Sequence, residues 1–172
     1  MAMRRAVALT FLAMMVVLLI GLGWELHARA EVRKARGDYI AALQRFEQKA
    51  KTPAEMERLP WAAQYLYLKS KVYPQRQEDL DVARQALKRV KQYKGKILEP
   101  GLRSRLGDYI GVADRLLTWT EEMWANEKEI DAAYFARDWG RRQELALDRS
   151  ALGEKGQELV EAERRKWEKT GL

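Results

Sequence analysis

The sequence predicts an all-α protein: one N-terminal transmembrane helix, followed by a four- to five-helix bundle or helical-hairpin domain. Three observations support this fold class. Residues 6–24 carry no charge, only four prolines and eleven glycines interrupt the 172 residues, and β-branched residues are scarce after residue 24. Alanine, leucine, glutamate, lysine and arginine, which dominate the remainder, favour helix. We therefore expect no sheet.

Residues 6–24 form the predicted transmembrane anchor. As a helix these nineteen residues would extend about 28 Å, close to the hydrocarbon thickness of a bilayer. A cleaved secretion signal is the alternative, because Ala28-Arg29-Ala30 places small residues before Glu31. The apolar run is longer than a signal-peptide core, and Trp24 lies where an aromatic side chain would meet the lipid–water interface. These two features favour an uncleaved anchor.

The charges on either side of the anchor give two answers for its orientation. Residues 1–5 form a short basic tail, and a second basic group follows the span. A count of positive charges places the domain in the cytoplasm, whereas the signal-anchor pattern and the length of the domain favour export. We expect a single-pass membrane protein, preferably of a bacterial inner membrane, with its domain on the periplasmic side. The predicted membrane-interface residues are Arg4, Arg5, Trp24, Arg29, Arg33 and Lys34.

Residues 25–36 contain no helix breaker and predict a helical neck that continues the membrane helix to Gly37. Residues 37–172 are then the soluble α-helical domain. Apolar residues at three- and four-residue steps predict an amphipathic helix over 38–51. The only histidine, His27, lies in the neck, where we expect it to face solvent or lipid.

Three short segments carry a resemblance to a known family. Residues 37–46, Gly-Asp-Tyr-Ile-Ala-Ala-Leu-Gln-Arg-Phe, resemble the second helix of a tetratricopeptide repeat, with Ala42 and Phe46 at its small and aromatic positions. Residues 107–110 repeat Gly-Asp-Tyr-Ile, and residues 132–139 resemble the end of a repeat's first helix and its turn. The resemblance implies helical hairpins. It departs from the family before Gly37, where the basic neck takes the place of a first helix.

Capping and breaking residues predict the remaining helices. Thr52-Pro53-Ala54-Glu55 reads as a helix start, with Thr52 as its N-cap. We expect helices over 61–72, ended by Pro74, and over 76–94, 102–137 and 141–169. Ile97 and Leu98 should both enter the core, and Trp139-Gly140 should close the third of these helices. The last helix has a thin apolar seam, so its end should be frayed or ordered against a partner.

Charge is unevenly distributed along the domain. Residues 61–105 hold eleven lysines or arginines against four acids, and residues 106–140 hold three against eight. Consecutive antiparallel helices of opposite charge could pair with each other, or the two blocks could be docking faces. The candidate partner-binding residues are Arg84, Lys88, Arg89, Lys91, Lys94, Trp119, Trp124, Glu121 and Glu122. Core packing is the other interpretation of the two tryptophans.

The inventory of reactive groups argues against an enzyme. The chain has no cysteine, one histidine and no glycine-rich phosphate loop, and no serine has a nucleophile context. We expect no cofactor and no metal. Nucleic acid is disfavoured because only Tyr93 lies among the basic residues, so acidic lipid headgroups are the better anionic partner.

The expected function is therefore that of a non-catalytic scaffold, accessory or assembly subunit of a membrane-bound protein complex. The anchor, the missing catalytic groups and the charge-segregated helices motivate this hypothesis. Two alternatives stay open. One is an envelope-bridging or spanin-like tether, against which six tryptophans argue. The other is a helical sensor or ligand-binding domain, which would need an apolar cavity between its helices and a second membrane span, and the missing second span argues against it.

Overall fold

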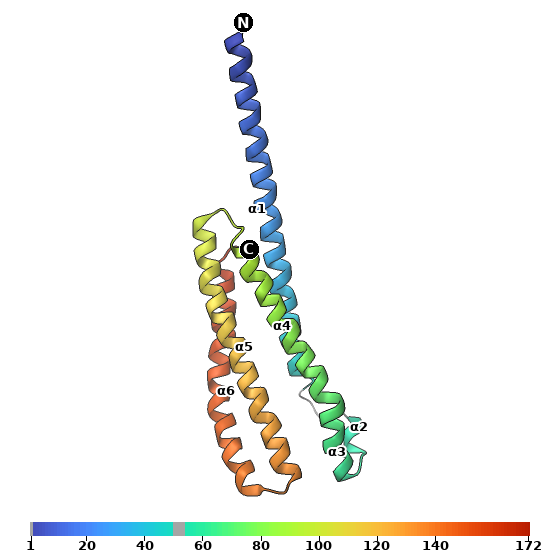
Figure 1. The fold of residues 1–172 in the computed structure, drawn as a ribbon. Coiled ribbons are helices and arrows are strands. Elements are labelled where there is room, and N and C mark those ends of the chain that lie inside the picture. Colours follow the sequence, from blue (N-terminus) through green and yellow to red (C-terminus); the bar gives the residue numbers. More distant parts are fainter. Residues whose placement is uncertain (1, 50–53) are drawn as a thin grey trace.

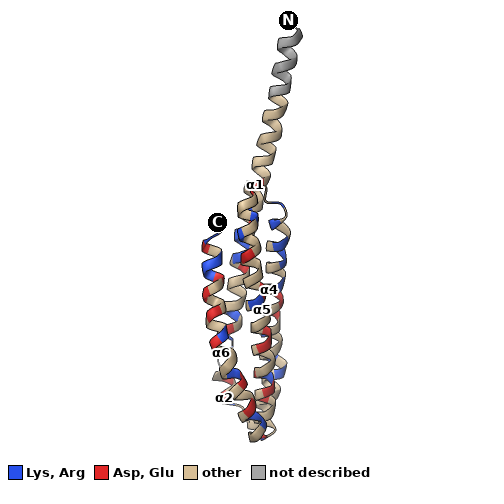
Figure 2. Cartoon of the chain, turned by 90° about the vertical axis from the view of Figure 1, so that its left-hand side faces the viewer, with Lys and Arg blue, Asp and Glu red and all other residues tan. Residues whose placement is uncertain are grey.

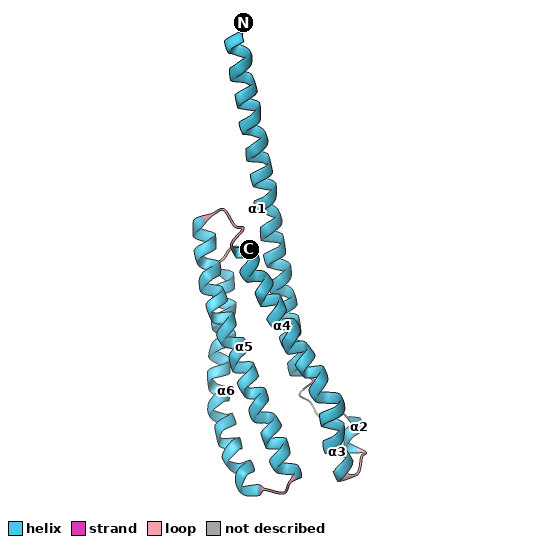
Figure 3. Cartoon of the chain, viewed as in Figure 1, coloured by secondary structure: helices cyan, strands magenta, loops and turns pink. Residues whose placement is uncertain are grey.

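A computed structural model describes residues 2–49 and 54–172, with side chains described from residue 12. Within these ranges the structure contains helices and no strand (Figure 3). The elements are α1 (Ala2–Gln48), α2 (Ala54–Glu57), α3 (Trp61–Tyr67), the π-helix η1 (Leu68–Val72), α4 (Tyr73–Lys94), α5 (Pro100–Phe135) and α6 (Trp139–Glu168). The prediction of an all-α chain is confirmed. The predicted N-cap Thr52 and its neighbour Pro53 lie outside the described residues.

Helix α1 has two parts with different surroundings. Its N-terminal part projects alone beyond the other helices, and its C-terminal part lies beside α4 (Figure 1). The side chains from Leu12 to Ile20 are all exposed, and they are uncharged. Among the described residues α1 is the one helix long and apolar enough to cross a membrane. The prediction of one long apolar N-terminal helix is confirmed.

Helix α1 continues through Gly37, where the neck was expected to end. It continues to Gln48 because one buried stripe crosses the glycine: Ala28, Val32, Ala35, Tyr39, Ala42 and Phe46 all belong to the core. A glycine inside a helix costs about 1 kcal/mol, which the burial of these side chains outweighs. The expected neck, residues 25–36, is thus part of the packed body and no separate element.

The core lies between four long helices, α1, α4, α5 and α6 (Figure 1). Helix α4 packs along α1, and α6 packs along α5. Tyr39 and Tyr109 are both fully buried, and the hydroxyl of Tyr39 donates a hydrogen bond of 2.9 Å to the carbonyl of Ala113. The phenol therefore crosses from α1 to α5 without leaving its polar atom unpaired. Below, the end of this body that holds Glu25, residues 95–99 and the C-terminus is called the near end, and the opposite end is called the far end.

Pro74 does not end a helix, contrary to the prediction. Helix α3 runs through η1 into α4, and the N–H of Tyr73 bonds to the carbonyl of Leu68, five residues earlier. Proline disrupts a helix because it lacks an N–H and its ring meets the carbonyl four residues before it. The wider π turn immediately before Pro74 moves the carbonyls of that turn aside, so the chain keeps its helical direction.

The position of the connection between α4 and α5 was predicted correctly. The prediction that both Ile97 and Leu98 enter the core holds for Ile97 alone. Ile97 is fully buried, but Leu98 is 58% exposed. The two residues lie in a non-helical segment, where successive side chains point in opposite directions, so only one of them can enter the core. The N–H of Leu98 bonds to the carboxylate of Glu25, and Arg103 Nε donates a bond of 2.9 Å to the Ile97 carbonyl. These contacts hold the segment at the near end.

Trp139 starts α6 and does not close α5. Arg137 has a φ of 60°, a left-handed conformation that ends α5, and the Asp138 carboxylate then accepts a 3.0 Å bond from the Arg141 N–H as an N-cap. The C-terminal end of α6 is also packed, contrary to the expected fraying. Trp167 and Leu172 contact the core, and Arg36 Nε of α1 lies 3.3 Å from the buried carboxylate of Glu163.

The three segments with tetratricopeptide-like sequences occupy different environments. Residues 37–46 lie inside α1, residues 107–110 lie inside α5, and residues 132–139 include the turn between α5 and α6. The resemblance to that family stays a prediction.

Candidate functional site

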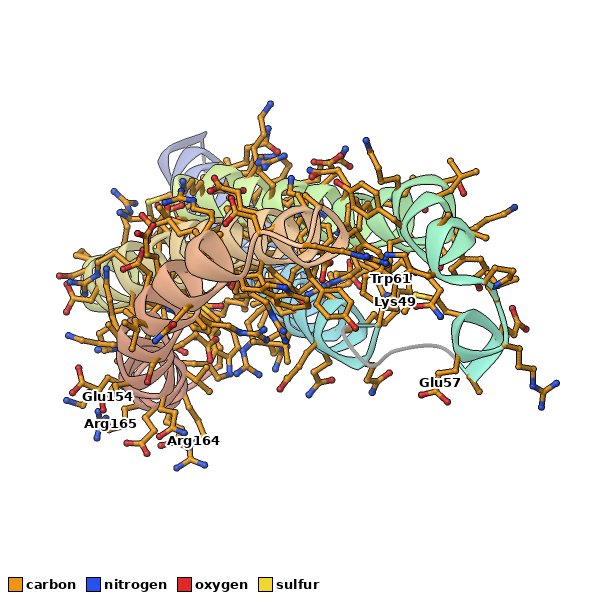
Figure 4. All side chains as sticks on the ribbon, turned by 90° about the horizontal axis from the view of Figure 1, so that it is seen from below. Lys49, Glu57, Trp61, Glu154, Arg164 and Arg165 are labelled. Carbon is orange, nitrogen blue, oxygen red and sulfur yellow. The ribbon has the colours of Figure 1, made fainter. Side chains whose placement is uncertain are left out.

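A cavity of about 550 Å³ opens between the helices at the far end. Helices α2, α3, α4, α5 and α6 contribute to it, together with η1 and Lys49, which follows the end of α1. Figure 4 views the chain from below, with Lys49 and Glu57 labelled on the side of α1 and α2. Its charged lining residues are four cations, Lys49, Arg76, Arg142 and Arg149, and three carboxylates, Glu57, Glu127 and Asp131. We call this cavity the far-end pocket.

Arg76 is the most deeply buried cation of the far-end pocket, with 4% of its surface exposed. Its guanidinium lies between two aromatic rings, 4.2 Å from the centroid of Phe46 and 4.1 Å from that of Trp124. One terminal nitrogen donates a 3.0 Å bond to Glu127, while the Nε atom is buried without a partner. Cation–π contacts strengthen when they are desolvated, so Arg76 ties α4 to both α1 and α5.

Asp131 lies one helical turn beyond Glu127 on α5 and accepts a 2.8 Å bond from the hydroxyl of Tyr73. Burial raises the pKa of Asp131 above its usual value, and the neighbouring carboxylate of Glu127 raises it further, although the Tyr73 bond acts in the opposite direction. Burial and the bond to Asp131 likewise raise the pKa of Tyr73. The floor of the pocket thus combines a buried guanidinium with a carboxyl group that retains its proton more readily than usual.

Aromatic rings gather beside the far-end pocket, in what we call the distal aromatic cluster: Trp61, Tyr65, Tyr134, Phe135 and Trp139. Trp61 lies 4.6 Å from Tyr134 and 5.0 Å from Phe135, between ring centroids. Trp139 is 54% exposed, and its ring lies 5.9 Å from that of Tyr134. The guanidinium of Arg142 covers both Tyr134 and Trp139. Exposed tryptophan beside arginine is the composition of protein-interface hot spots.

The basic residues of α4 are largely paired within the chain. Arg84 contacts Glu121 at 2.5 Å, and Lys91 contacts Asp114 at 2.7 Å, both across the interface with α5. Arg89 contacts Asp38 of α1 at 2.6 Å. Lys88 is exposed and Lys94 is half-buried near Gly107. The pairing of α4 with α5 supports the interpretation of complementary neighbouring helices over that of two separate docking faces.

Of the two interpretations of Trp119 and Trp124, partner contact and core packing, the structure favours core packing for Trp124. Trp124 is 3% exposed and belongs to the core, so a partner cannot reach it in this fold. Trp119 is half-buried, and its indole N–H donates a 2.8 Å bond to the Leu152 carbonyl of α6. Glu122 is exposed on the same helix, in a shallow groove between α5 and α6. Apart from the ion pair of Arg84 with Glu121, the structure does not bring the tryptophans and acidic candidates together with the basic ones into a single site.

The predicted membrane-interface residues that the structure describes lie near the start of the packed part of α1. Trp24, Arg33 and Lys34 are exposed. Arg29 bonds to Glu25 at 2.8 Å and to Glu99 at 2.8 Å. The side chains of Arg4 and Arg5 lie outside those described. Across the part of the chain that is described, no group of three histidine, cysteine, aspartate or glutamate residues could hold a metal ion.

Comparison with protein-family models, curated proteins and solved structures gave no significant match. The candidate site therefore rests on geometry. Sequence reasoning missed the distal aromatic cluster because its members come from α3, the end of α5 and the start of α6, and no local spacing connects them. One sequence signal was present: Trp61 and Trp139 both follow a helix-starting residue, Pro60 and Asp138, and thus lie at helix ends.

Proposed function

We propose that this protein is a non-catalytic, membrane-anchored helical scaffold, an accessory or assembly subunit of a membrane-bound protein complex. One observation carries the proposal: α1 is a single helix whose exposed apolar part leads without interruption into the core stripe around Val32 and Tyr39. Because one helix would form both the anchor and part of the core, no flexible linker would separate them. The body would therefore keep a fixed orientation relative to the bilayer.

The distal aromatic cluster is the surface that we assign to the partner. Helix α5 has 36 residues and is therefore about 54 Å long, so the far end would stand tens of ångströms from the bilayer. There, Trp61 and Trp139 combine apolar area with nearby arginine, which suits a protein partner of the same complex. We retain a bacterial inner membrane and an exported domain as proposals that rest on the sequence.

Photo-crosslinking in native membranes tests this function. A photoreactive phenylalanine analogue replaces Trp139, and the matched control places it at Val160, which is equally exposed on α6. We expect a specific adduct with a second membrane-associated protein from position 139 and none from position 160. Recovery of the chain without an adduct at either position, and as a monomer in several mild detergents, would contradict the scaffold proposal.

A second candidate function has one observation in its favour. Four cations line the far-end pocket, Lys49, Arg76, Arg142 and Arg149, which favours a small polar ligand with a carboxylate. A thermal-shift series with small organic carboxylates tests this ligand-binding function. Stabilisation that is lost in Arg76→Lys would support it. No stabilisation by any of them, or equal stabilisation of the variant, would leave the scaffold as the single candidate.

A further inference from the structure

The connection between α4 and α5, residues 95–99, lies beside the part of α1 at which the apolar stretch ends. The N–H of Leu98 bonds to the carboxylate of Glu25, which directly follows Trp24. The Nζ atom of Lys96 lies 5.6 Å from the ring centroid of Trp24 and 4.4 Å from that of Tyr93. If residues 6–24 span a bilayer, Trp24 lies at its interface, and Lys96 and Leu98 must lie within a few ångströms of the same depth.

Leu98 is presented outward at this depth. It is 58% exposed, while its neighbour Ile97 is fully buried and fixed by the bond from Arg103 Nε to the Ile97 carbonyl. The bond to Glu25 fixes the other side of the same peptide segment. An exposed leucine on a segment held at both sides is therefore a defined feature of the fold.

The charge around Leu98 is predominantly positive. Residues 24–29 and 94–105 contain five cations, Arg29, Lys94, Lys96, Arg103 and Arg105, against two carboxylates, Glu25 and Glu99. Both carboxylates are engaged by arginine: Glu25 by Arg29, and Glu99 by Arg29 and Arg105. Figure 2 shows lysine and arginine at this end of the body, beside the uncharged part of α1. Anionic headgroups are attracted to such a surface.

We propose that the near end of the body is a second membrane contact, in which Leu98 enters the headgroup region and Lys96 and Arg105 bind anionic lipid. This inference rests on the proposed anchoring function and adds the partner's chemistry: a bilayer surface with negatively charged headgroups. It moves the lipid contact away from the middle of α4, where Arg84 and Lys91 pair with α5, to the segment next to the span. Two contacts, the span and the loop, would fix the tilt of the body.

Spin-label accessibility in the full-length chain tests the proposal. The sequence contains no cysteine, so one introduced cysteine gives a unique label. Nitroxides are placed by Leu98→Cys, by Ile20→Cys in the apolar part of α1, and by Leu66→Cys, an exposed leucine of the far end. The protein is reconstituted in nanodiscs of phosphatidylcholine alone or mixed with phosphatidylglycerol, and collision with oxygen is compared with collision with a water-soluble nickel chelate.

We expect the label at position 98 to be intermediate in lipid exposure between the labels at positions 20 and 66 in the anionic nanodiscs, and to become more aqueous in phosphatidylcholine alone. The label at position 66 should stay aqueous in both. Removing one cation by Lys96→Gln or Arg105→Gln should shift the ratio of docked to undocked loop about fivefold. The matched variant Lys88→Gln removes an exposed lysine of α4 that lies farther from the near end. It should leave that ratio unchanged.

Each other result overturns a specific statement. If position 98 is as aqueous as position 66 while position 20 is lipid-exposed, the second contact is wrong and the anchor stands. Equal insertion in both lipid compositions contradicts the preference for anionic headgroups. Protection of position 98 from both oxygen and nickel means that protein covers it, which also contradicts the proposal. An aqueous label at position 20 contradicts the anchoring function itself.

Discussion

The indole ring of Trp119 occupies the space that a side chain at Gly156 would need. A Cβ atom built at position 156 would lie 2.1 Å from Cζ2 of Trp119, and the indole N–H bonds to the Leu152 carbonyl one turn earlier on α6. Helix α6 is thus held against α5 by a large ring lying on a glycine. This contact compensates for the few apolar residues on α6, where Leu145 is the buried leucine.

Gly156→Ala should destabilise the protein by about 1–3 kcal/mol, the usual cost of overpacking, because the ring cannot move away without losing its bond to Leu152. Gly153→Ala is the matched control, since nothing lies within 4 Å of a Cβ built there. Alanine at position 153 should stabilise by up to about 1 kcal/mol through its higher helix propensity. Urea unfolding followed by far-ultraviolet circular dichroism measures both. Equal effects of the two substitutions would contradict the packing of Trp119 on Gly156.

Arg76→Met should destabilise the protein by about 3 kcal/mol. It removes the partner of Glu127 and leaves that carboxylate unpaired at the floor of the far-end pocket. The double variant Arg76→Met with Glu127→Gln should recover at least half of the loss, since it leaves no unpaired charge. A double-mutant cycle in urea measures the coupling. Independent, additive effects of the two substitutions would show that the pair does not interact in the folded protein.

Asp131 should make the protein less stable as pH rises above 3.8, the ordinary pKa of the group. The sign follows from linkage: the pKa of the folded carboxyl is raised, so the folded state binds this proton more tightly than the unfolded state does. The stabilisation is present at low pH and is lost as the pH rises through the folded pKa. Asp131→Asn should flatten the decline of the unfolding free energy with pH, measured by urea unfolding over a pH series. Parallel curves for the two proteins would contradict this assignment.

The exposed ion pair between Arg84 and Glu121 should contribute less than about 1 kcal/mol, because both side chains are accessible to solvent and to salt. A cycle of Arg84→Ala and Glu121→Ala should give a small coupling at low salt that disappears at high salt. A coupling above that size, or one unaffected by salt, would mean that the paired charges of α4 and α5 hold the helices together more strongly than their exposure allows.

The sequence was sufficient for elements whose limits are set locally. Helix α5 was predicted from residue 102 and starts at Pro100, because Pro100-Gly101 excludes a continuing helix before it. Local rules failed where a distant contact decides. Gly37 should weaken α1, but α4 and α5 bury the residues on both sides of it, and the π turn that accommodates Pro74 has no recognisable sequence pattern.

The burial of aromatic residues was the hardest feature to predict. Trp124 and Trp139 both stand among charged residues in the sequence, yet one is 3% and the other 54% exposed. What distinguishes them is the buried guanidinium of Arg76, which comes from α4 and lies on the ring of Trp124. A contact between two residues that are 48 positions apart in the sequence cannot be recognised from helical periodicity, so the candidate site emerged from the structure.

The measurement that bears most directly on membrane anchoring is the intact mass of the protein recovered from membranes washed with alkaline carbonate. We predict that the chain stays in the membrane pellet and that its mass includes residues 6–24, because α1 continues from this apolar stretch into the core without a break. Release into the supernatant, or a mass that lacks about the first thirty residues, would contradict the account.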